Sequence, residues 1–544
     1  MKNTYFLPLG GTGEIGMNLN LYGYGEGKNI DWFMVDCGVT FSQAGLPGID
    51  LQMPDPTFIA SQKDKLMGII LTHAHEDHIG AMPFIWPYFK CPIYTTEFTA
   101  ALLIEKFDEY NIDYTNKIFI HNDSEVINIG NFQVKAIGLT HSIPEMSALL
   151  IKSPSANIFH TGDWKIDKDP IVGDGFDKKK LLDFENIEID ALVCDSTNAM
   201  TPGISGSELS VKNSLEEIIG KIEGRIFLST FASNVARLCS VAEAAAKHDR
   251  HVVLSGRGMH RIVNAAKSVG LLRGLPDFID EENAGYLPAE KTLILCTGSQ
   301  GEYRAALSKI ARDEHQHIVA EKGDTVIFSS KIIPGNEAGI MNLQNLFAKK
   351  DIKIITGKDE FVHVSGHPCQ DELIEMYNLI QPKSIIPVHG EFRHLVANAN
   401  LAKNNGIKNT LVIENGTIVK ISSKDVVIDQ QVESGRLYKD GKIIIYDYES
   451  PSNERSKISF TGLIVISIIL QNNKIKSKPK IKMVGLPEFD EEGIKLSDWV
   501  NHALENIISS KNKSGNLESK IKNAVIRQIR EVWGKKPKVE VIFH

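Results

Sequence analysis

Apolar positions in the first 200 residues form short runs that are bounded by polar residues. The runs include NIDWFMVDCG, MGIILTHAH, NFQVKAIGLTH, ANIFHTGDWK and IDALVCDST, and several end in a cluster of Gly, Thr, Asp or His. Short apolar runs between turn residues predict strands. We therefore expect a β-rich N-terminal block that presents polar side chains on the loops at its strand ends.

From about residue 208 the pattern changes to a strand, a loop of small residues and a helix. It occurs four times, in GRIFLSTFASNVARLCSVAEAAA, RHVVLSGRGMHRIVNAAKSVG, KTLILCTGSQGEYRAALSKIA and GDTVIFSSKIIPGNEAGIMNLQNLF. These segments share an architecture but no repeated motif. Strand–loop–helix units in series predict a parallel sheet with helices that cover it. After residue 360, His-rich loops again lie between a helix and strands.

The C-terminal part of the chain begins with a polar stretch, 424–459, which shows no regular pattern and which we interpret as a linker. The apolar strand LIVISIIL follows it at 463–470. We expect the chain to end in an amphipathic helix that Gly534 and Pro537 terminate. Five apolar residues share one stripe of this helix: Leu517, Ile521, Val525, Ile529 and Val532. The expected segments are 1–207 and 361–423 for a first domain in two parts, 208–360 for an inserted domain, 424–459 for the linker and 460–544 for a small α+β domain.

The stretch GGTGEIG contains the G-x-G-x-x-G spacing of dinucleotide-binding proteins, at Gly11, Gly13 and Gly16. That motif binds a pyrophosphate only where a helix follows the glycines. Here MNLNLYGYG follows, in which apolar and polar residues alternate with period two. This period predicts a strand, so the glycines form a strand-to-strand loop and a dinucleotide site is excluded.

The composition of the chain excludes few classes of function. The 544 residues, enough for about three or four domains, are 42% hydrophobic and 24% charged, with a formal net charge of −8. Nucleic-acid binding would therefore need a local basic groove. Six scattered cysteines without a C-x-x-C pair indicate neither a zinc ribbon nor a disulfide framework. Without a signal-peptide pattern or an apolar run long enough to span a bilayer, we expect a cytoplasmic protein that has no membrane association.

The segment LTHAHEDHIGA, residues 71–81, places four potential metal ligands within six positions. A strand delivers His73 and His75 to one side, and Asp77 and His78 follow where the chain turns. Such side chains would lose water without gaining partners if they served packing alone. The H-x-H-x-D-H spacing after a strand therefore predicts a metal site.

Three further residues at strand ends would complete a site for two ions. They are His141 in GLTHSIP, Asp163 in HTGDWK and His389 in IIPVHGE, and each alone could equally be an ordinary polar residue. The expected ligands are His73, His75 and His141 for one ion, Asp77, His78 and His389 for the other, and Asp163 as a bridge. Two zinc ions so placed can activate a water molecule and stabilise charge on a leaving oxygen.

Asp36 and His160 lie close to these motifs in the sequence. Asp36, in MVDCG, is better suited to orienting a histidine than to binding a ribose. His160 could also be a ligand, but we interpret it as an ordinary strand-end histidine.

The N-terminal block resembles the metallo-β-lactamase superfamily, because Asp36, the 73–78 cluster, His141 and Asp163 match its motifs in order. The inserted block resembles the β-CASP nucleic-acid-processing branch, and nearly the whole chain resembles the ribonuclease J family. The matching motifs are GGTGEIGMN, THAHEDHIGA, THSIPE, HTGDWK, CDSTNA, STFASNVAR, CTGSQGE, FSSKIIPGN, HVSGH and PVHGE. The resemblance implies an α/β protein: a metallo-β-lactamase αββα sandwich with an inserted β-CASP parallel-sheet domain and a small α+β C-terminal domain.

The resemblance also implies two catalytic residues. Asp195, in CDSTNA, would donate a proton to the leaving oxygen, although an Asp in this position can equally cap a turn. His367 would be its acid–base partner near the metals, although a histidine before a proline is often structural.

Two loops would bind the substrate. One offers hydroxyl, amide and imidazole donors to a phosphate. Its residues are His363, Val364, Ser365, Gly366 and His367. In STFASN, Phe231 could stack on a base while the Ala232 amide and the Ser233 hydroxyl bind phosphate. The alternative is that this second loop only caps the helix after it.

Two features of the C-terminal half have weaker interpretations. A period-two series of lysines would form one basic face on a strand: Lys474, Lys476, Lys478, Lys480 and Lys482. We favour a protected edge strand, with RNA contact as the alternative. GLPGID, with Gly48 and Asp50, together with Asp447, resembles a structural calcium site of some relatives, although it offers few oxygen ligands.

We expect a zinc-dependent ribonuclease with 5′-to-3′ exonuclease and endonuclease activity on single-stranded RNA, acting in RNA maturation and mRNA decay. Two Zn²⁺ ions would bind per chain, with Mn²⁺ or Mg²⁺ as alternatives. The resemblance implies a homodimer or a dimer of dimers and an RNA-degradation complex as partners. The alternatives are another hydrolase on the same fold, such as a thioesterase or lactonase, and a non-catalytic RNA-binding scaffold. The inserted domain disfavours the first alternative, and the full ligand set disfavours the second.

Overall fold

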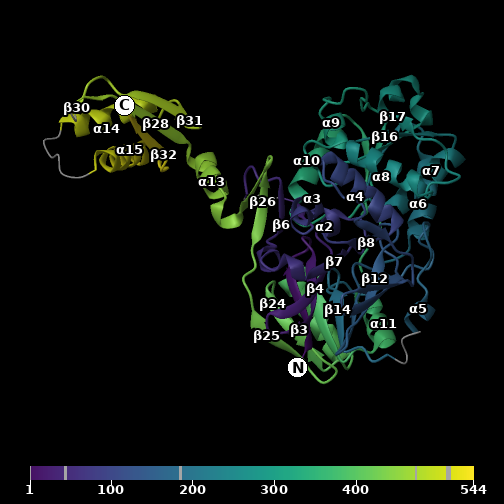
Figure 1. Ribbon diagram of the computed structural model, residues 1–544. Helices are drawn as coiled ribbons and strands as arrows, with labels where there is room; N and C mark the ends of the chain where they lie inside the picture. Colours follow the sequence, from purple (N-terminus) through teal and green to yellow (C-terminus); the bar gives the residue numbers. More distant parts are fainter. Residues whose placement is uncertain (1, 42–45, 183–186, 472–473, 510–515) are drawn as a thin grey trace. The chain divides into compact units, whose positions relative to one another are not determined.

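The computed structural model divides into two compact units (Figure 1). The larger comprises Met1–Thr40 and Gln52–Arg436, and the smaller comprises Phe41–Leu51 and Leu437–His544. The residues that the structure describes are 2–41, 46–182, 187–471, 474–509 and 516–544. Within these ranges, no helix combines the length and the apolar character that a membrane span requires.

The first sheet of the larger unit has eight strands, in the order β25-β24-β1-β3-β4-β7-β8-β9. Their bounds are β1 (Asn3–Gly10), β3 (Leu19–Glu26), β4 (Asn29–Val35), β7 (Leu66–Ile70), β8 (Ile93–Thr95), β9 (Ile118–Ile120), β24 (Thr417–Ile421) and β25 (Val426–Gln431). The purple N-terminal strands thus lie beside the green strands β24 and β25 (Figure 1). The GGTGEIG loop joins β1 to its antiparallel neighbour β3 and contains only the two-residue strand β2 (Thr12–Gly13), as the period-two pattern predicted.

The second sheet has seven strands, in the order β10-β11-β12-β13-β14-β21-β23. Their bounds are β10 (Val126–Ile129), β11 (Phe132–Gly138), β12 (Ser147–Lys152), β13 (Asn157–His160), β14 (Ala191–Asp195), β21 (Ser384–Val388) and β23 (Asn409–Thr410). Side chains of both sheets, among them Phe33, Val134 and Ile386, share one buried apolar core. Leu373 of α11 (Gln370–Ile380) packs on the outer face with Leu192. This arrangement is the expected sandwich.

The N-terminal block also contains a long helix, α4 (Glu97–Glu109), which our interpretation of this block as mostly strands did not identify. It contacts β9 of the first sheet. Further elements outside these two sheets are β6 (Leu51–Pro54), β22 (Gly390–Glu391), α1 (Thr57–Ala60), α2 (Glu76–Ile79), α3 (Met82–Ile85), α5 (Lys178–Leu182), α12 (Phe392–Asn404), η1 (Lys63–Lys65) and η2 (Trp86–Tyr88).

The inserted sheet is parallel throughout, with the order β17-β16-β18-β15-β19-β20. Its elements are β15 (Ile226–Ser229), β16 (His251–Ser255), β17 (Ile279–Asp280), β18 (Thr292–Cys296), β19 (Thr325–Phe328), β20 (Lys353–Ile355), α6 (Glu208–Lys221), α7 (Val235–Lys247), α8 (Arg257–Ser268), α9 (Ala306–Ala311), α10 (Glu337–Ala348), η3 (Glu281–Tyr286) and η4 (Ala289–Lys291). Each of the four strand–loop–helix segments forms the strand and the helix predicted for it. The parallel sheet is therefore confirmed.

The smaller unit contains a three-stranded sheet and two helices around their own core. They are β28 (Leu463–Ile468), β31 (Lys480–Val484), β32 (Lys538–Phe543), α14 (Leu496–Ser509) and α15 (Leu517–Trp533). The predicted apolar stripe of α15 faces this core, and Gly534 ends the helix in a left-handed conformation. The prediction that the chain ends in this helix was wrong, because β32 follows and pairs in parallel with β28.

The interpretation of 424–459 as irregular was also wrong. This stretch forms β25, β26 (Arg436–Asp440), β27 (Ile443–Tyr446), η5 (Asp447–Glu449) and most of α13 (Ser452–Thr461). β25 shows why the sequence pattern did not reveal these strands: it is an edge strand of its sheet. Only Val426 of this strand is buried, so its side chains show no alternation of apolar and polar residues.

The lysine series does not lie on one strand. It is divided between β30 (Lys474–Ile475), which pairs with β29 (Leu470–Gln471), and β31, which pairs with β28. Lys480 and Lys482 do share the exposed face of β31, and β31 is an edge strand. The edge-strand interpretation is therefore confirmed for these two lysines, while RNA contact stays untested.

Candidate metal centre

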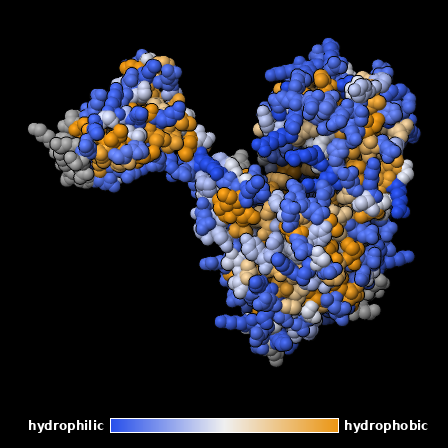
Figure 2. Space-filling model, turned by 45° about the horizontal axis from the view of Figure 1, so that its top comes forward, coloured by the Kyte–Doolittle hydropathy of each residue, from blue (hydrophilic) through white to orange (hydrophobic). Residues whose placement is uncertain are grey.

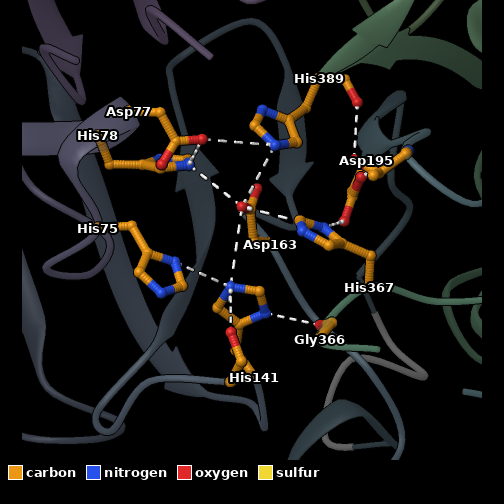
Figure 3. A network of polar contacts seen from close by, with 12 residues as sticks. His75, Asp77, His78, His141, Asp163, Asp195, Gly366, His367 and His389 are labelled. Atoms are coloured by element: carbon orange, nitrogen blue, oxygen red, sulfur yellow. Dashed lines mark hydrogen bonds and ion pairs between the residues drawn. The ribbon is translucent and has the colours of Figure 1, made fainter. Parts of the chain in front are cut away.

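The residues expected to bind metal come from loops that follow strands of the two packed sheets. His73 and His75 follow β7, and His141 follows β11. Asp163 and His389 follow β13 and β21, which flank β14 as parallel neighbours. Because the carboxyl ends of parallel strands meet at one edge of a sheet, these loops converge on one place. Figure 3 shows the side chains directed toward one another there.

The first group of ligand atoms comprises Nε2 of His73, Nδ1 of His75 and Nε2 of His141. The His75 nitrogen lies 3.1 Å from each of the other two. Tetrahedral zinc with bonds of about 2.0–2.1 Å needs nitrogens about 3.3 Å apart. The three imidazoles therefore fit one zinc ion.

The second group surrounds Asp163. Its Oδ2 atom lies 3.2 Å from Nε2 of His78 and 3.3 Å from Nε2 of His389. The Asp77 carboxylate lies 3.6 Å from the first of these nitrogens and 3.7 Å from the second. The same Asp163 oxygen is 3.8 Å from His73 Nε2 of the first group. The carboxylate thus reaches both groups, as a bridging ligand must.

The opposite ring nitrogens are held by hydrogen-bond partners. His78 Nδ1 lies 2.7 Å from Asp36 Oδ2, and the Thr72 amide donates to the same carboxylate. His141 Nδ1 donates to the Gly366 carbonyl at 2.6 Å, and His389 Nδ1 donates to Asn18 Oδ1 at 3.0 Å. Such partners fix the tautomer, so the inner nitrogens present lone pairs to a metal. The predicted contact of Asp36 with a histidine is present.

Burial prepares the first group for a cation. It holds the pKa of His73 and of His141 well below the ordinary value, and neighbouring histidines add to this effect. Burial lowers the pKa of His75 to about 4. A neutral imidazole is the form that binds metal, so these residues are in the required state near pH 7.

The second group is rich in negative charge. Burial would lower the pKa of His78, but the carboxylates of Asp163, Asp77 and Asp36 raise it well above its ordinary value. Carboxylates that hold a proton on His78 also attract a divalent cation. The residues present therefore fit two metal ions by donor type, spacing and charge.

Asp195 and His367 form a pair beside the ligands. His367 Nδ1 lies 2.8 Å from Asp195 Oδ2 and 3.9 Å from Asp163 Oδ2. Burial opposes the charged ring, but the carboxylates, Asp195 first, raise the pKa of His367 to about 9. The turn-capping alternative is also present, because Asp195 Oδ1 accepts from the Thr197 amide. One carboxylate therefore makes both contacts.

The 363–367 loop packs against the first ligand group. Gly366 has no room for a side chain, since a Cβ there would lie 2.9 Å from His141 Cε1 and 2.8 Å from Ser142 Oγ. Ser365 Oγ accepts from Asn198 Nδ2 at 2.7 Å. Val364 is buried. Burial, with nearby cations, lowers the pKa of His363 to about 3.

The 231–233 loop reaches the same place from the inserted domain. Ser233 Oγ lies 3.1 Å from His75 Nε2. Phe231 and Ala232 are partly exposed. Asn234 accepts from the Arg237 amide and caps α7, so the capping alternative also describes this segment. Figure 2 shows a hollow in the surface of the larger unit, bordered mainly by hydrophilic residues.

His160 lies apart from the ligand groups. It is buried, and its Nδ1 is 2.8 Å from the Tyr22 hydroxyl. No metal-ligating group found among the described residues includes it. Its interpretation as an ordinary strand-end histidine stays a prediction.

The calcium residues lie in the smaller unit and have protein partners. Asp50 accepts from the Gly441 amide, and Asp447 accepts from the Tyr448 amide. Gly48 lies beside the guanidinium group of Arg455. The calcium site stays a prediction.

The sequence patterns did not identify three residues that shape this region. Asn18 contacts His78 and His389, and Asn198 binds the 363–367 loop. Arg237 is fully buried, forms an ion pair with Glu208 at 3.0 Å and donates to the Val362 carbonyl. All three lie inside motifs of the family resemblance, Asn18 in GGTGEIGMN, Asn198 in CDSTNA and Arg237 in STFASNVAR, and this was the only signal that could have indicated them.

Four family models match the chain. They are the Beta-lactamase superfamily domain at 31–182, the Ribonuclease J, beta-CASP domain at 223–347, the Zn-dependent metallo-hydrolase RNA specificity domain at 351–412 and the Ribonuclease J C-terminal domain at 453–544. The third match contains the 363–367 loop and His389. The metallo-β-lactamase, β-CASP and C-terminal domains expected from the sequence are thus present.

Whole proteins also match. Ribonuclease J of Sinorhizobium meliloti is 44% identical over 99% of this chain and 96% of its own length. Ribonuclease J of Corynebacterium glutamicum is 34% identical over 97% of this chain and 74% of its own length. A solved structure of a protein of unknown function from Enterococcus faecalis aligns with a TM-score of 0.54 at 18% identity, covering 77% of this chain and 100% of its own, and shows the fold alone. The chain belongs to the ribonuclease J family of metal-dependent ribonucleases.

Proposed function

We propose that this protein is a zinc-dependent ribonuclease that degrades single-stranded RNA from the 5′ end, also cleaves it internally, and acts in RNA maturation and mRNA decay. The observation that carries the proposal is the Asp163 carboxylate, which lies within reach of two ligand groups and of His367. Two ions, one for each group, with a proton donor beside them would form an arrangement suited to phosphodiester hydrolysis.

The ions, when bound, would supply Lewis acidity for activating water and for balancing charge on the phosphate. The chain's own residues do the rest. The Asp36 carboxylate and the Gly366 carbonyl hold His78 and His141 in the orientation that ligands need. A proton held between Asp195 Oδ2 and His367 Nδ1, 2.8 Å apart, is available to the leaving oxygen.

The 363–367 loop is proposed to hold the 5′-terminal phosphate. The Ser365 hydroxyl and the backbone amides of this loop are neutral donors of the kind that bind anions. A 5′-monophosphate fits such a set, whereas a triphosphate adds two charged groups. We therefore expect faster degradation of monophosphorylated RNA. Ser233, which lies beside His75, and its neighbours Phe231 and Ala232 would contact the nucleotides that follow.

Further parts of the proposal concern the setting of the enzyme. We infer that it works in the cytoplasm as a homodimer or a dimer of dimers, joins an RNA-degradation complex, and has the domain bounds 1–207, 208–360, 361–423 and 460–544. The family match at 453–544 supports a distinct C-terminal domain. Sedimentation equilibrium of the purified chain tests the oligomer.

The activity is tested with RNA labelled at its 3′ end, incubated with and without a chelator and resolved on a denaturing gel. The proposal requires chelator-sensitive loss of full-length RNA, with 3′-labelled products that shorten progressively from the 5′ end. A parallel incubation with a thioester tests the rival hydrolase. Thioester hydrolysis without RNA cleavage would overturn the proposal.

A further inference from the structure

The 363–367 loop itself lacks an unpaired positive charge for a phosphate. His363 is neutral near pH 7, because burial lowers its pKa to about 3. His367 lies 2.8 Å from the Asp195 carboxylate, which balances any charge on its ring. Ser365 and Gly366 are neutral. A 5′-terminal phosphate, which carries a charge of about −2 at neutral pH, therefore needs a cation from outside the loop.

Three cations lie near His363: Arg237, Lys331 and Lys165. Arg237 is fully buried and pairs with Glu208 at 3.0 Å. Lys165 is also fully buried and pairs with Asp167 at 2.9 Å. Both are therefore structural. Lys331 is exposed, and no carboxylate among the described residues lies within ion-pair distance of it. It is the one of the three that solvent and substrate can reach.

Contacts with two neighbouring motifs hold Lys331 in place. It follows β19 in the FSSKIIPGN motif, and its carbonyl accepts from Gln300 Nε2 at 2.9 Å. The Lys331 ammonium donates to Asn198 Oδ1 at 3.2 Å. Asn198 Nδ2 in turn donates to Ser365 Oγ and to the His367 carbonyl. An ammonium group has three donors, so this geometry leaves two beside the loop.

We propose that Lys331 provides the positive charge that recognises the 5′-terminal phosphate of the RNA substrate, and that Asn198 positions its ammonium group against Ser365. The inference rests on the proposed 5′-end recognition by the 363–367 loop, and it identifies the source of the positive charge that this loop does not supply. Lys331 belongs to the inserted domain and the loop to the returning part of the sandwich. A bound 5′ phosphate would therefore contact both.

The test compares RNAs of one sequence that carry a 5′-monophosphate or a 5′-hydroxyl. Binding is measured by fluorescence anisotropy at several salt concentrations, and KM and kcat are measured separately. Lys331→Met removes the charge and keeps the stem, while Lys331→Arg keeps the charge. The matched control is Lys221→Met. Lys221 is an exposed lysine of α6, and its one ion pair among the described residues is with Glu217. It precedes the N-terminal end of β15, away from the loops at the C-terminal ends of the strands of the inserted sheet.

Lys331→Met should weaken binding of the monophosphorylated RNA by about 10- to 100-fold and reduce its salt slope by about 0.7. Binding of the hydroxyl RNA should change less than about twofold. Lys331→Arg should retain most of the preference for monophosphorylated over hydroxyl RNA, and Lys221→Met should retain all of it. For Lys331→Met on the monophosphorylated RNA, KM should rise while kcat stays nearly unchanged.

Two results would overturn the inference. If wild type prefers the monophosphate and Lys331→Met keeps that preference, the inference fails while the proposed function stands. If Lys331→Met weakens both RNAs equally, the lysine contacts the chain of the RNA and not its end. Absence of RNA cleavage by wild type would instead refute the proposed function itself.

Discussion

Adding one methyl group at Gly366 should disturb the first metal site without touching any metal-binding atom directly. The added Cβ would lie 2.9 Å from His141 Cε1 and 2.8 Å from Ser142 Oγ. Non-bonded carbons are in optimal contact at about 3.5–4.0 Å, so the His141 ring must retreat by roughly 0.6 Å. The ring cannot move freely, because its Nδ1 donates to the Gly366 carbonyl at 2.6 Å.

The size of the effect follows from this displacement. Metal–ligand distances tolerate deviations of only about 0.2 Å. A misplacement of about 1 Å in a reacting group costs on the order of 10²-fold in rate. We therefore expect Gly366→Ala to lose the ion held by His73, His75 and His141 in a large fraction of molecules, and to cleave RNA about 10- to 100-fold more slowly.

The assay is metal content by mass spectrometry, measured together with single-turnover cleavage. Gly357→Ala is the matched control in the same segment. A Cβ at Gly357 would meet no heavy atom within 4 Å, and its backbone needs no left-handed conformation. The control should keep the metal content and the rate of wild type. Two ions per chain and normal cleavage in Gly366→Ala would refute the account of how His141 is held.

Three other changes have defined outcomes. Asp195→Asn should slow single-turnover cleavage by roughly 10²- to 10⁴-fold, the usual contribution of a general acid, with RNA affinity nearly unchanged. A large loss of RNA affinity with an unchanged cleavage rate would reassign Asp195 to substrate positioning. Ser365→Ala removes one donor to an anion, worth about 1.5–3 kcal/mol, and should reduce the preference for monophosphorylated over triphosphorylated RNA, whereas an unchanged ratio would show that the loop does not sense the end. Arg237→Met leaves buried Glu208 unpaired and should lower the free energy of unfolding by about 3–5 kcal/mol in a denaturant titration, while exposed Arg273→Met should change it by less than about 0.5 kcal/mol.

Much of the fold and of the ligand set could be predicted because the signals are local. The strand–loop–helix segments of the inserted domain carry their own periodicity, and each formed as expected. The expected ligands His73, His75, Asp77 and His78 follow one strand within six positions. His141, Asp163 and His389 also end strands, so the arrangement of strands in the sheets brings them together.

The missed residues depend on contacts between distant parts of the chain. Asn18 occupies a polar position of an apparent strand, and nothing local indicates that it will meet His389, 371 positions away. Arg237 lies at helical spacing with Val241 and Ala244 on the buried face of α7, where a charge is not expected, and only the distant Glu208 and Val362 carbonyl satisfy it. β25 lacks alternation because neither of its faces is covered, so every residue after Val426 is exposed.

The most direct test of a two-ion ribonuclease is metal content and RNA cleavage measured on the same preparations of wild type and Asp163→Ala. Wild type should carry close to two transition-metal ions per chain, mainly zinc, and should lose activity with a chelator and regain it with zinc. Because Asp163 reaches both ligand groups, its replacement should lower the occupancy of both sites and abolish cleavage. Full cleavage by metal-free wild type, or by Asp163→Ala, would contradict the proposed chemistry.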